Sequence, residues 1–283
     1  DAPKALQQKY AELQDTRLPA RSKNTDQTRK MHKLMLQPSA RPMYAAVVDG
    51  MDQAIGQVLD TLDEQGIAEN TIVLFFSDNG GAAYASGGAD NVPLRGGKGE
   101  TWEGGIRVVS LLRWPQRLAG AQRMDQIMTA MDVFPTLAAA AGVTPGNDTF
   151  ELDGVSLWPA ISEGKPAPRQ DLVFFASETP IRGSFMLTAF NDHWKLVQGV
   201  QKGMLSANVT NYLFKISEDP NEYNNLASEH PAVVAQMAEA IHQWRTMYPV
   251  AGTRSELVPP PGWRAPRDWS SYPRSLEETQ DQA

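Results

Sequence analysis

No cysteine occurs among the 283 residues of the chain. This absence excludes disulfide bonds, a thiol nucleophile and cysteine-ligated metal sites. Long apolar runs are also missing, because none approaches the roughly 20 residues that a membrane-spanning helix needs. The net charge is −7 and no basic stripe is visible, which argues against nucleic acid as the main partner. The chain is nevertheless 41% hydrophobic, so it can bury the substantial core of one large domain or slightly more.

Residues 44–81 predict a helix, a buried strand and a glycine loop in that order. Apolar residues recur at three- and four-residue steps over 44–62, which is typical of an amphipathic helix, and Gly66 is suited to end it. The run 71–77 is apolar on both faces, as in a central parallel strand flanked by helices. This order is half of a βαβ unit, so the pattern predicts an α/β fold.

The remaining chain predicts further strands and a change of texture near residue 170. Residues 107–113 read as a strand, and 126–130 as a strand or turn before a helix that Asp132 would cap. Four short β-like runs follow between residues 171 and 217, separated by turn residues, which favours a small antiparallel sheet. An amphipathic helix over 230–248 is expected to pack on that sheet.

The strand at 71–77 ends in an acid, an amide and two glycines. In open α/β sheets, ligands gather beyond the carboxyl ends of the strands, where Asp78 and Asn79 lie. A carboxylate and an amide carbonyl both donate oxygen, which suits a hard cation such as Ca²⁺ or Mg²⁺. The glycines would allow a ligand to approach closely. Taken alone, the same residues fit a simple strand-ending turn at least as well.

A second glycine-rich segment, "PLRGGKGETWEGGIRV", places Lys98 among glycines, with Arg95 nearby. Backbone N–H groups and an ammonium in such a loop can converge on an anion, usually phosphate or sulfate. The spacing is not that of a P-loop. Glu103 and Arg107 are candidates to pair with each other and shape the loop. A flexible surface loop with an exposed lysine is the alternative interpretation.

Five segments in sequence order carry a resemblance to a known family. They are "YAAVVDGMDQAIGQVLDTLDEQGIAENTIVLFFSDNGG", "LRGGKGETWEGGIRV", "MDVFPTLAAAAGV", "LDGVSLWPAI" and "YLFKISEDPNEYNNLA". Together they resemble the formylglycine-dependent (type I) sulfatases, or arylsulfatases, over roughly residues 44–247. The resemblance implies that Asp78 and Asn79 are two of the four protein ligands of a divalent cation, commonly Ca²⁺. It implies that Lys98 is a catalytic residue that binds the sulfate group.

The resemblance also implies a fold class and a division of the chain. The fold would be α/β, part of a large mixed sheet sandwiched by helices as in alkaline phosphatase-like proteins. A small C-terminal antiparallel sheet with a packed helix would accompany it. Residues 1–168 would be the C-terminal half of the catalytic domain, 169–250 a small α+β subdomain, and 251–283 a Pro- and Trp-rich tail.

The nucleophile of such enzymes has no counterpart in this sequence. The family carries it near the start of the chain in C-x-P-x-R or S-x-P-x-R, where the Cys or Ser becomes formylglycine. Two N-terminal aspartates complete the metal site. The nearest stretch here, "LQPSAR" at 36–41, puts Leu36 at the nucleophile position and its arginine one position late. Since the chain also starts at Asp1 without Met or a signal peptide, we expect a processed or truncated product, inactive alone. Its partner would be the missing N-terminal part, as a separate chain or a cleaved segment.

The predicted function is therefore that of a sulfuric ester hydrolase fragment acting on a sulfate ester. The resemblance favours a periplasmic or secreted protein, and a cytoplasmic one stays open. Two alternatives remain. One is a phosphodiesterase or phosphonate monoester hydrolase of the same superfamily, and the other is a degenerate, non-catalytic module that binds an anion or carbohydrate.

Overall fold

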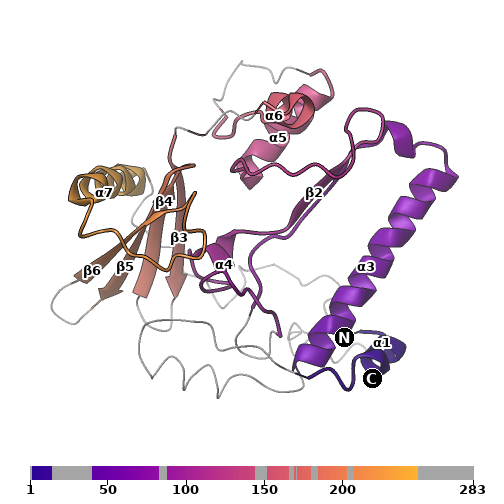
Figure 1. Cartoon of the computed structure of the whole chain (residues 1–283), viewed down its shortest axis with the longest axis horizontal. Helices are drawn as coiled ribbons and strands as arrows, with labels where there is room; N and C mark the ends of the chain where they lie inside the picture. Colours follow the sequence, from indigo (N-terminus) through magenta and orange to yellow (C-terminus); the bar gives the residue numbers. More distant parts are fainter. Residues whose placement is uncertain are drawn as a thin grey trace, which may run out of the picture. The chain divides into compact units, whose positions relative to one another are not determined.

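The computed structural model describes residues 2–14, 40–82, 88–143, 152–165, 169, 171–179, 184–202 and 207–247. The chain forms two compact units, Asp1–Trp244 and Arg245–Ala283. The elements described below belong to the first unit, apart from the last residues of the C-terminal helix (Figure 1). The predicted boundaries after residues 168 and 250 stay predictions, and the predicted tail 251–283 lies outside the described residues. Among the described helices, none has the length and apolar character that crossing a bilayer requires.

The predicted amphipathic helix is confirmed as α3 (Ala40–Glu64). Its end has the geometry expected of a C-terminal glycine: Gly66 has φ 68°, and the N–H of Ile67 donates to the carbonyl of Leu62 at 3.1 Å. A short 3-10 helix, η1 (Ala68–Asn70), then leads to the first strand.

Helix α3 buries only part of its apolar surface within this chain. The short helix α1 (Lys4–Lys9) packs on it, and Ala2, Leu6 and Ala46 form a small buried cluster between them. The apolar stripe over 47–58 is largely exposed, with exposed fractions of 39–58% at Val47, Val48, Met51 and Val58.

The predicted strand at 71–77 is confirmed as β1 (Val73–Phe76), and the one at 107–113 as β2 (Ser110–Arg113). The two pair antiparallel, with Val73 opposite Arg113. The sequence predicted that this strand is parallel to its neighbours and buried on both faces, and for the described residues this was wrong. Among them, β2 is the sheet neighbour of β1, and the residues of β1 are half-buried or exposed. An apolar run indicates that a strand needs covering, and it does not indicate which segment covers it.

Along the chain, α4 (Glu103–Ile106) lies between β1 and β2, and the helices α5 (Ala130–Ala140) and α6 (Trp158–Glu163) lie between β2 and the C-terminal sheet. Residues 126–129 are not in a strand. The prediction that Asp132 is the N-cap of α5 was wrong, because Thr129 occupies that position and Asp132 is the third helical residue. Asp132 still caps the helix from inside, since Oδ2 accepts the Thr129 N–H at 2.7 Å.

The predicted C-terminal antiparallel sheet is confirmed. Its strands pair in the order in which they occur in the chain, and helix α7 (Pro231–Thr246) follows them. The strands are β3 (Val173–Thr179), β4 (Ser184–Phe190), β5 (Trp194–Lys202) and β6 (Ala207–Lys215). Short separations in sequence between consecutive β-like runs favour this hairpin order.

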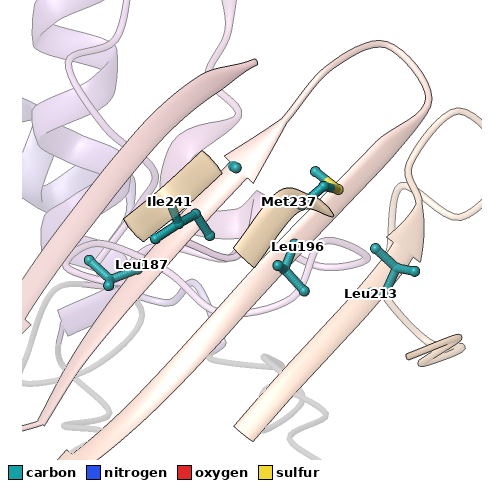
Figure 2. Packing of buried hydrophobic residues seen from close by; sticks show 6 residues of the cluster. Leu187, Leu196, Leu213, Met237 and Ile241 are labelled. Carbon is teal, nitrogen blue, oxygen red and sulfur yellow. The ribbon is translucent and has the colours of Figure 1, made fainter. Parts of the chain in front are cut away.

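One face of this sheet and helix α7 form the largest buried apolar cluster of the described residues. Met237 and Ile241 of α7 pack over Leu187, Leu196 and Leu213, one from each of three neighbouring strands (Figure 2). These five side chains are at most 6% exposed. At about 25 cal/mol per Å² of apolar surface, such burial is the main stabilising term for the region.

Candidate functional site

The residues after β1 form a tight turn that orients Asp78 and Asn79. Ser77 Oγ donates to the Asn79 carbonyl at 2.9 Å, and the Asn79 N–H donates to Asp78 Oδ1 at 2.9 Å. Asn79 Nδ2 donates to the Gly80 carbonyl at 3.2 Å. The turn chemistry allowed by the sequence is therefore present. Within the described residues, no hydrogen bond engages Asp78 Oδ2 or Asn79 Oδ1, which are the oxygen types that a hard cation binds.

Glycines bring this turn into contact with the loop that carries Lys98. A Cβ on Gly80 would lie 1.8 Å from the Gly104 carbonyl oxygen, so glycine is required there. The Gly80 N–H donates to the Gly105 carbonyl at 2.8 Å, and the Lys98 N–H donates to the Gly81 carbonyl at 3.2 Å. The structure thus joins the segments of all three predicted site residues through their backbones.

Asn91 links the same two segments, although its sequence position shows nothing beyond an amide in a polar loop. Its Oδ1 accepts the Gly81 N–H at 2.9 Å. Its Nδ2 donates to the carbonyls of Gly81 at 2.8 Å and Gly96 at 3.2 Å. The side chain of Lys98 is exposed in the turn that follows.

Residues 97–100, which contain Lys98, form the lysine turn. A buried cluster of charged side chains begins just after it in the chain. Glu103 is 4% exposed, and its Oε2 accepts from Arg107 Nε at 2.5 Å, so the predicted pairing of these two residues is confirmed. Its Oε1 accepts from Lys195 Nζ at 2.8 Å. The same Lys195 nitrogen lies 2.8 Å from Glu222 Oε1. Lys195 and Glu222 are 0% and 2% exposed, and neither was predicted to belong to the site.

The pKa values of the two carboxylates in the cluster, Glu103 and Glu222, shift in opposite directions. Burial raises the pKa of Glu222 above its ordinary value, and the charge of Lys195 offsets part of the rise. Burial also opposes ionisation of Glu103. There, the charges of Lys195 and Arg107 and their hydrogen bonds outweigh it, so the pKa of Glu103 lies below its ordinary value. Glu103 therefore keeps its negative charge to a lower pH than Glu222 does.

The donor set around Asp78 fits a part of a hard-cation site. A carboxylate and an amide oxygen from consecutive residues are ligands that Ca²⁺ and Mg²⁺ accept, but Ca²⁺ takes six to eight oxygens in all. Among the residues that the structure describes, no group of three or more His, Cys, Asp or Glu side chains could hold a metal ion. Asp78 and Asn79 would therefore account for only two of the ligands that such an ion needs, and further ligands would have to come from elsewhere.

Two family models match the chain. The model described as Sulfatase matches residues 2–143, and the one described as N-sulphoglucosamine sulphohydrolase, C-terminal, matches residues 98–247. Arylsulfatase J of Mus musculus is 30% identical over 247 residues, which cover 74% of this chain and 41% of that protein. Steryl-sulfatase of Rattus norvegicus is 44% identical over 124 residues, which cover 42% of this chain and 21% of that protein.

The solved structures agree with the predicted fold class. The crystal structure of Ps i-CgsB superposes with a TM-score of 0.63 at 28% identity, covering 78% of this chain and 46% of that one. This similarity confirms an α/β fold of the kind expected, with the C-terminal antiparallel sheet and helix as its smaller part. The chain spans at most about two fifths of the length of the two curated relatives described above.

Proposed function

Because the chain belongs to the sulfatase family, we propose that it is the C-terminal part of a sulfuric ester hydrolase. In this proposal the chain supplies two metal ligands and a sulfate-binding lysine, and an N-terminal part supplies the formylglycine nucleophile. The observation that carries the proposal is the backbone linkage of the Asp78–Asn79 turn to the Lys98 loop. Residues with the expected chemistry are held next to each other by contacts that require glycine.

Asp78 and Asn79 would hold a divalent cation, Ca²⁺ or alternatively Mg²⁺. When bound, the cation would supply positive charge that stabilises the nucleophile's oxygen and polarises the sulfate. The chain's contribution is orientation: the hydrogen bonds of Ser77 and Gly80 fix the turn before any ion binds. A ligand pair that is fixed in advance loses little conformational freedom when the ion arrives.

Lys98 would contact the sulfate group and offset the charge that develops on its oxygens. The residue is exposed, and its backbone is held by a hydrogen bond to Gly81 and by one within the turn, from the Glu100 N–H to the Gly97 carbonyl. A charge placed in advance at an anion lowers the barrier because it needs no reorganisation during the reaction.

The exposed apolar surface of the chain supports the proposal of a missing N-terminal part. Exposed side chains occur on α3, on the β1–β2 pair and on α5, for example Met51, Leu111 and Phe134 at 46%, 63% and 60%. Apolar surface that is contiguous and exposed marks an interaction site or an uncovered core. The N-terminal part would cover these faces and extend the two-stranded sheet. The family resemblance makes the periplasm or the exterior of the cell the expected compartment.

The test uses the complete enzyme, meaning this chain together with its N-terminal part. We expect hydrolysis of p-nitrophenyl sulfate and metal content near one divalent ion per molecule. Asp78→Ala should remove metal and activity together, because the ion loses a carboxylate ligand and the remaining acidic ligands repel one another. Elemental analysis and turnover of the same preparation check this, with Asp125→Ala, an exposed aspartate on a loop, as the matched control. Normal metal content with normal turnover in Asp78→Ala would contradict the assignment.

A substrate panel separates the two alternatives from the proposal. Faster hydrolysis of a phosphodiester or a phosphonate monoester than of the sulfate would indicate the related hydrolases. No turnover of any ester, with retained binding of sulfate or a carbohydrate, would indicate a non-catalytic module. A second polypeptide bearing C-x-P-x-R in material purified from the native source would count against that module.

A further inference from the structure

The residues that follow Lys98 contact the strands of the C-terminal sheet one after another. Ser177 of β3 donates from Oγ to the carbonyl of Gly99. Thr188 of β4 donates from its hydroxyl to Thr101 Oγ1 at 2.6 Å, and both side chains are buried. The lysine turn is therefore attached to the first two strands of the sheet by hydrogen bonds.

The next two residues of the loop reach the other two strands. The Trp102 ring meets the rings of Tyr212 and Phe214 on β6 edge to face, with centroids 5.3 and 6.1 Å apart. Lys195 of β5 binds the carboxylate of Glu103. All four strands thus hold a segment that begins directly after Lys98.

These contacts lie on the sheet face opposite α7. Side chains alternate between the faces of a strand, and Leu187, Leu196 and Leu213 pack on α7. Thr188, Lys195 and Phe214, each next in sequence to one of these leucines, therefore point to the other face. The sheet has a conventional apolar core on one side and the lysine loop on the other.

The charge cluster fixes Glu103 by both its side chain and its backbone. Lys195 binds the side chain, and Glu222 Oε2 accepts the Glu103 N–H at 2.9 Å. Glu103 is the first residue of α4, which carries the Gly104 and Gly105 contacts to Arg95 and Gly80. Replacing a buried ion pair by well-packed apolar residues is often neutral for stability, which favours a geometric role for these ions.

We infer that Lys195 is a positioning residue, whose buried ion pairs with Glu103 and Glu222 fix α4 and thereby the placement of the Lys98 turn against the Asp78–Asn79 turn. The catalytic part of the inference rests on the proposed function, in which Lys98 binds sulfate. The structural part does not, because it concerns the position of the loop alone.

The structural part is tested by hydrogen exchange on the complete enzyme. Lys195→Met removes the cation while keeping an unbranched side chain. We expect exchange over residues 95–107 to speed up by about tenfold or more, while protection over 231–246 changes much less. Arg169→Met is the matched control, because it breaks a comparably buried ion pair, with Asp132, that does not touch the loop. It should leave exchange over 95–107 unchanged.

Two results would overturn the structural part. One is unchanged exchange over 95–107 in Lys195→Met, and the other is an equal loss of protection in α7, which would make the cluster a general support of the sheet. If Lys195→Met does not fold, Glu222→Gln replaces it, since the amide keeps an oxygen for the Glu103 N–H and removes the charge. The same pattern with a smaller amplitude is then expected, and no change over 95–107 would refute the inference.

The catalytic part is tested by a double-mutant comparison. A group displaced by about 1 Å can cost about 10²-fold in rate, so Lys195→Met should lower kcat by that order with a smaller change in KM. A residue that acts through Lys98 has little left to impair once Lys98 is gone, so Lys195→Met should hardly affect the residual rate of Lys98→Ala. An undiminished effect in that background would overturn the positioning role. If the complete enzyme hydrolyses no sulfate ester at all, the proposed function fails, while hydrogen exchange still decides the structural part.

Discussion

Residues 171–247 and residues 40–113 differ in how far the chain itself covers their apolar surface. The C-terminal sheet buries leucines from three strands beneath α7, and its other face is covered by the lysine loop. The β1–β2 pair, in contrast, leaves Phe76, Val109 and Leu111 exposed by 42–63%. Together with the loop that follows Lys98, the first region covers its own apolar surface, whereas the second exposes apolar side chains of the kind that an interface or a core buries.

The difference shows how the candidate site is divided between the two regions. Asp78 and Asn79 belong to the incompletely covered sheet, and Lys98 belongs to a loop that the complete sheet holds. The Lys98 side of such a site can be well ordered even when the side that holds Asp78 and Asn79 is not, because local stability differs between the regions of a protein.

The isolated chain is the strongest test of the contrast. Expressed alone, residues 1–283 should hydrolyse no sulfate ester, bind divalent cation weakly and aggregate through the exposed edges of β1 and β2. Hydrogen exchange should be slow in β4–β6 and fast in β1 and α3. Co-expression with a segment that carries the nucleophile motif should give a soluble, metal-binding, active complex. A stable, cooperatively folding monomer with equally protected β1 and β5 would end both the contrast and the half-enzyme proposal.

The elements of the fold were largely predictable because their signals are local. The stripe of α3, its terminal Gly66 and the β-like runs of the C-terminal sheet depend on periodicity and turn residues, and each was confirmed. The partner of β1 was not correctly predicted in orientation, since pairing depends on segments distant in sequence. The N-cap of α5 was misassigned because Thr129 and Asp132 are both good capping residues, and the helix begins at the earlier one.

Candidate site residues could be selected from the sequence where polar side chains lie among glycines, and could not where a charge is buried, and the metal and sulfate roles of the selected residues stay predictions. Asp78, Asn79 and Lys98 stood out because acids, amides and lysines rarely need so many glycines around them. Lys195 did not, because a lysine in a strand normally faces solvent, and the covering of its face of the sheet depends on residues distant in sequence, such as Trp102. Glu222 lies in a polar turn, where a buried carboxylate is not expected.

Asp132 connects α5 to the residues that precede the C-terminal sheet, and its substitution tests how much this connection stabilises the fold. Its carboxylate accepts the N–H groups of Thr129 and Val155 and pairs with Arg169 at 2.6 Å. Asp132→Asn leaves the Arg169 charge buried without a partner, which should lower the unfolding free energy of the complete enzyme by about 3–5 kcal/mol at pH 7. Urea unfolding monitored at matched protein concentration measures the loss.

The pH dependence of that loss has a definite sign. Burial opposes the ionisation of Asp132, but its hydrogen bonds outweigh burial and hold its pKa below the ordinary 3.8. A lowered pKa contributes stability above pH 3.8 and loses it as the pH falls through the folded-state value. The gap between the enzyme and Asp132→Asn should therefore narrow below pH 3.8. Glu222, whose pKa is raised, changes stability in the opposite direction, but it is present in both proteins and cancels. A gap that widened on acidification would contradict the assignment.

The Lys98→Ala variant distinguishes a catalytic role of Lys98 from a structural one. The side chain is exposed, so its removal should leave the melting temperature of the complete enzyme nearly unchanged. Turnover of p-nitrophenyl sulfate should fall by about 10²–10³, as for other losses of a charge placed in advance at an anion. A sharp drop in melting temperature with normal turnover would make the lysine structural and the proposed site wrong.

Two valines that are exposed to a similar degree, one in each region, allow a direct comparison of stability effects, and the expected effects are small. Val58 on α3 is 58% exposed and Val209 on β6 is 51% exposed, so within this chain both Val→Ala changes should alter stability by less than about 0.5 kcal/mol. If the missing part covers α3, Val58→Ala removes two buried carbons in the complete enzyme, which at about 0.8 kcal/mol each costs about 1.5 kcal/mol. Val209→Ala should stay near zero, because β6 belongs to the region that this chain completes by itself. Urea unfolding of both variants in the complete enzyme decides the matter: equal small effects would mean that the α3 stripe stays exposed and that the N-terminal part does not dock there.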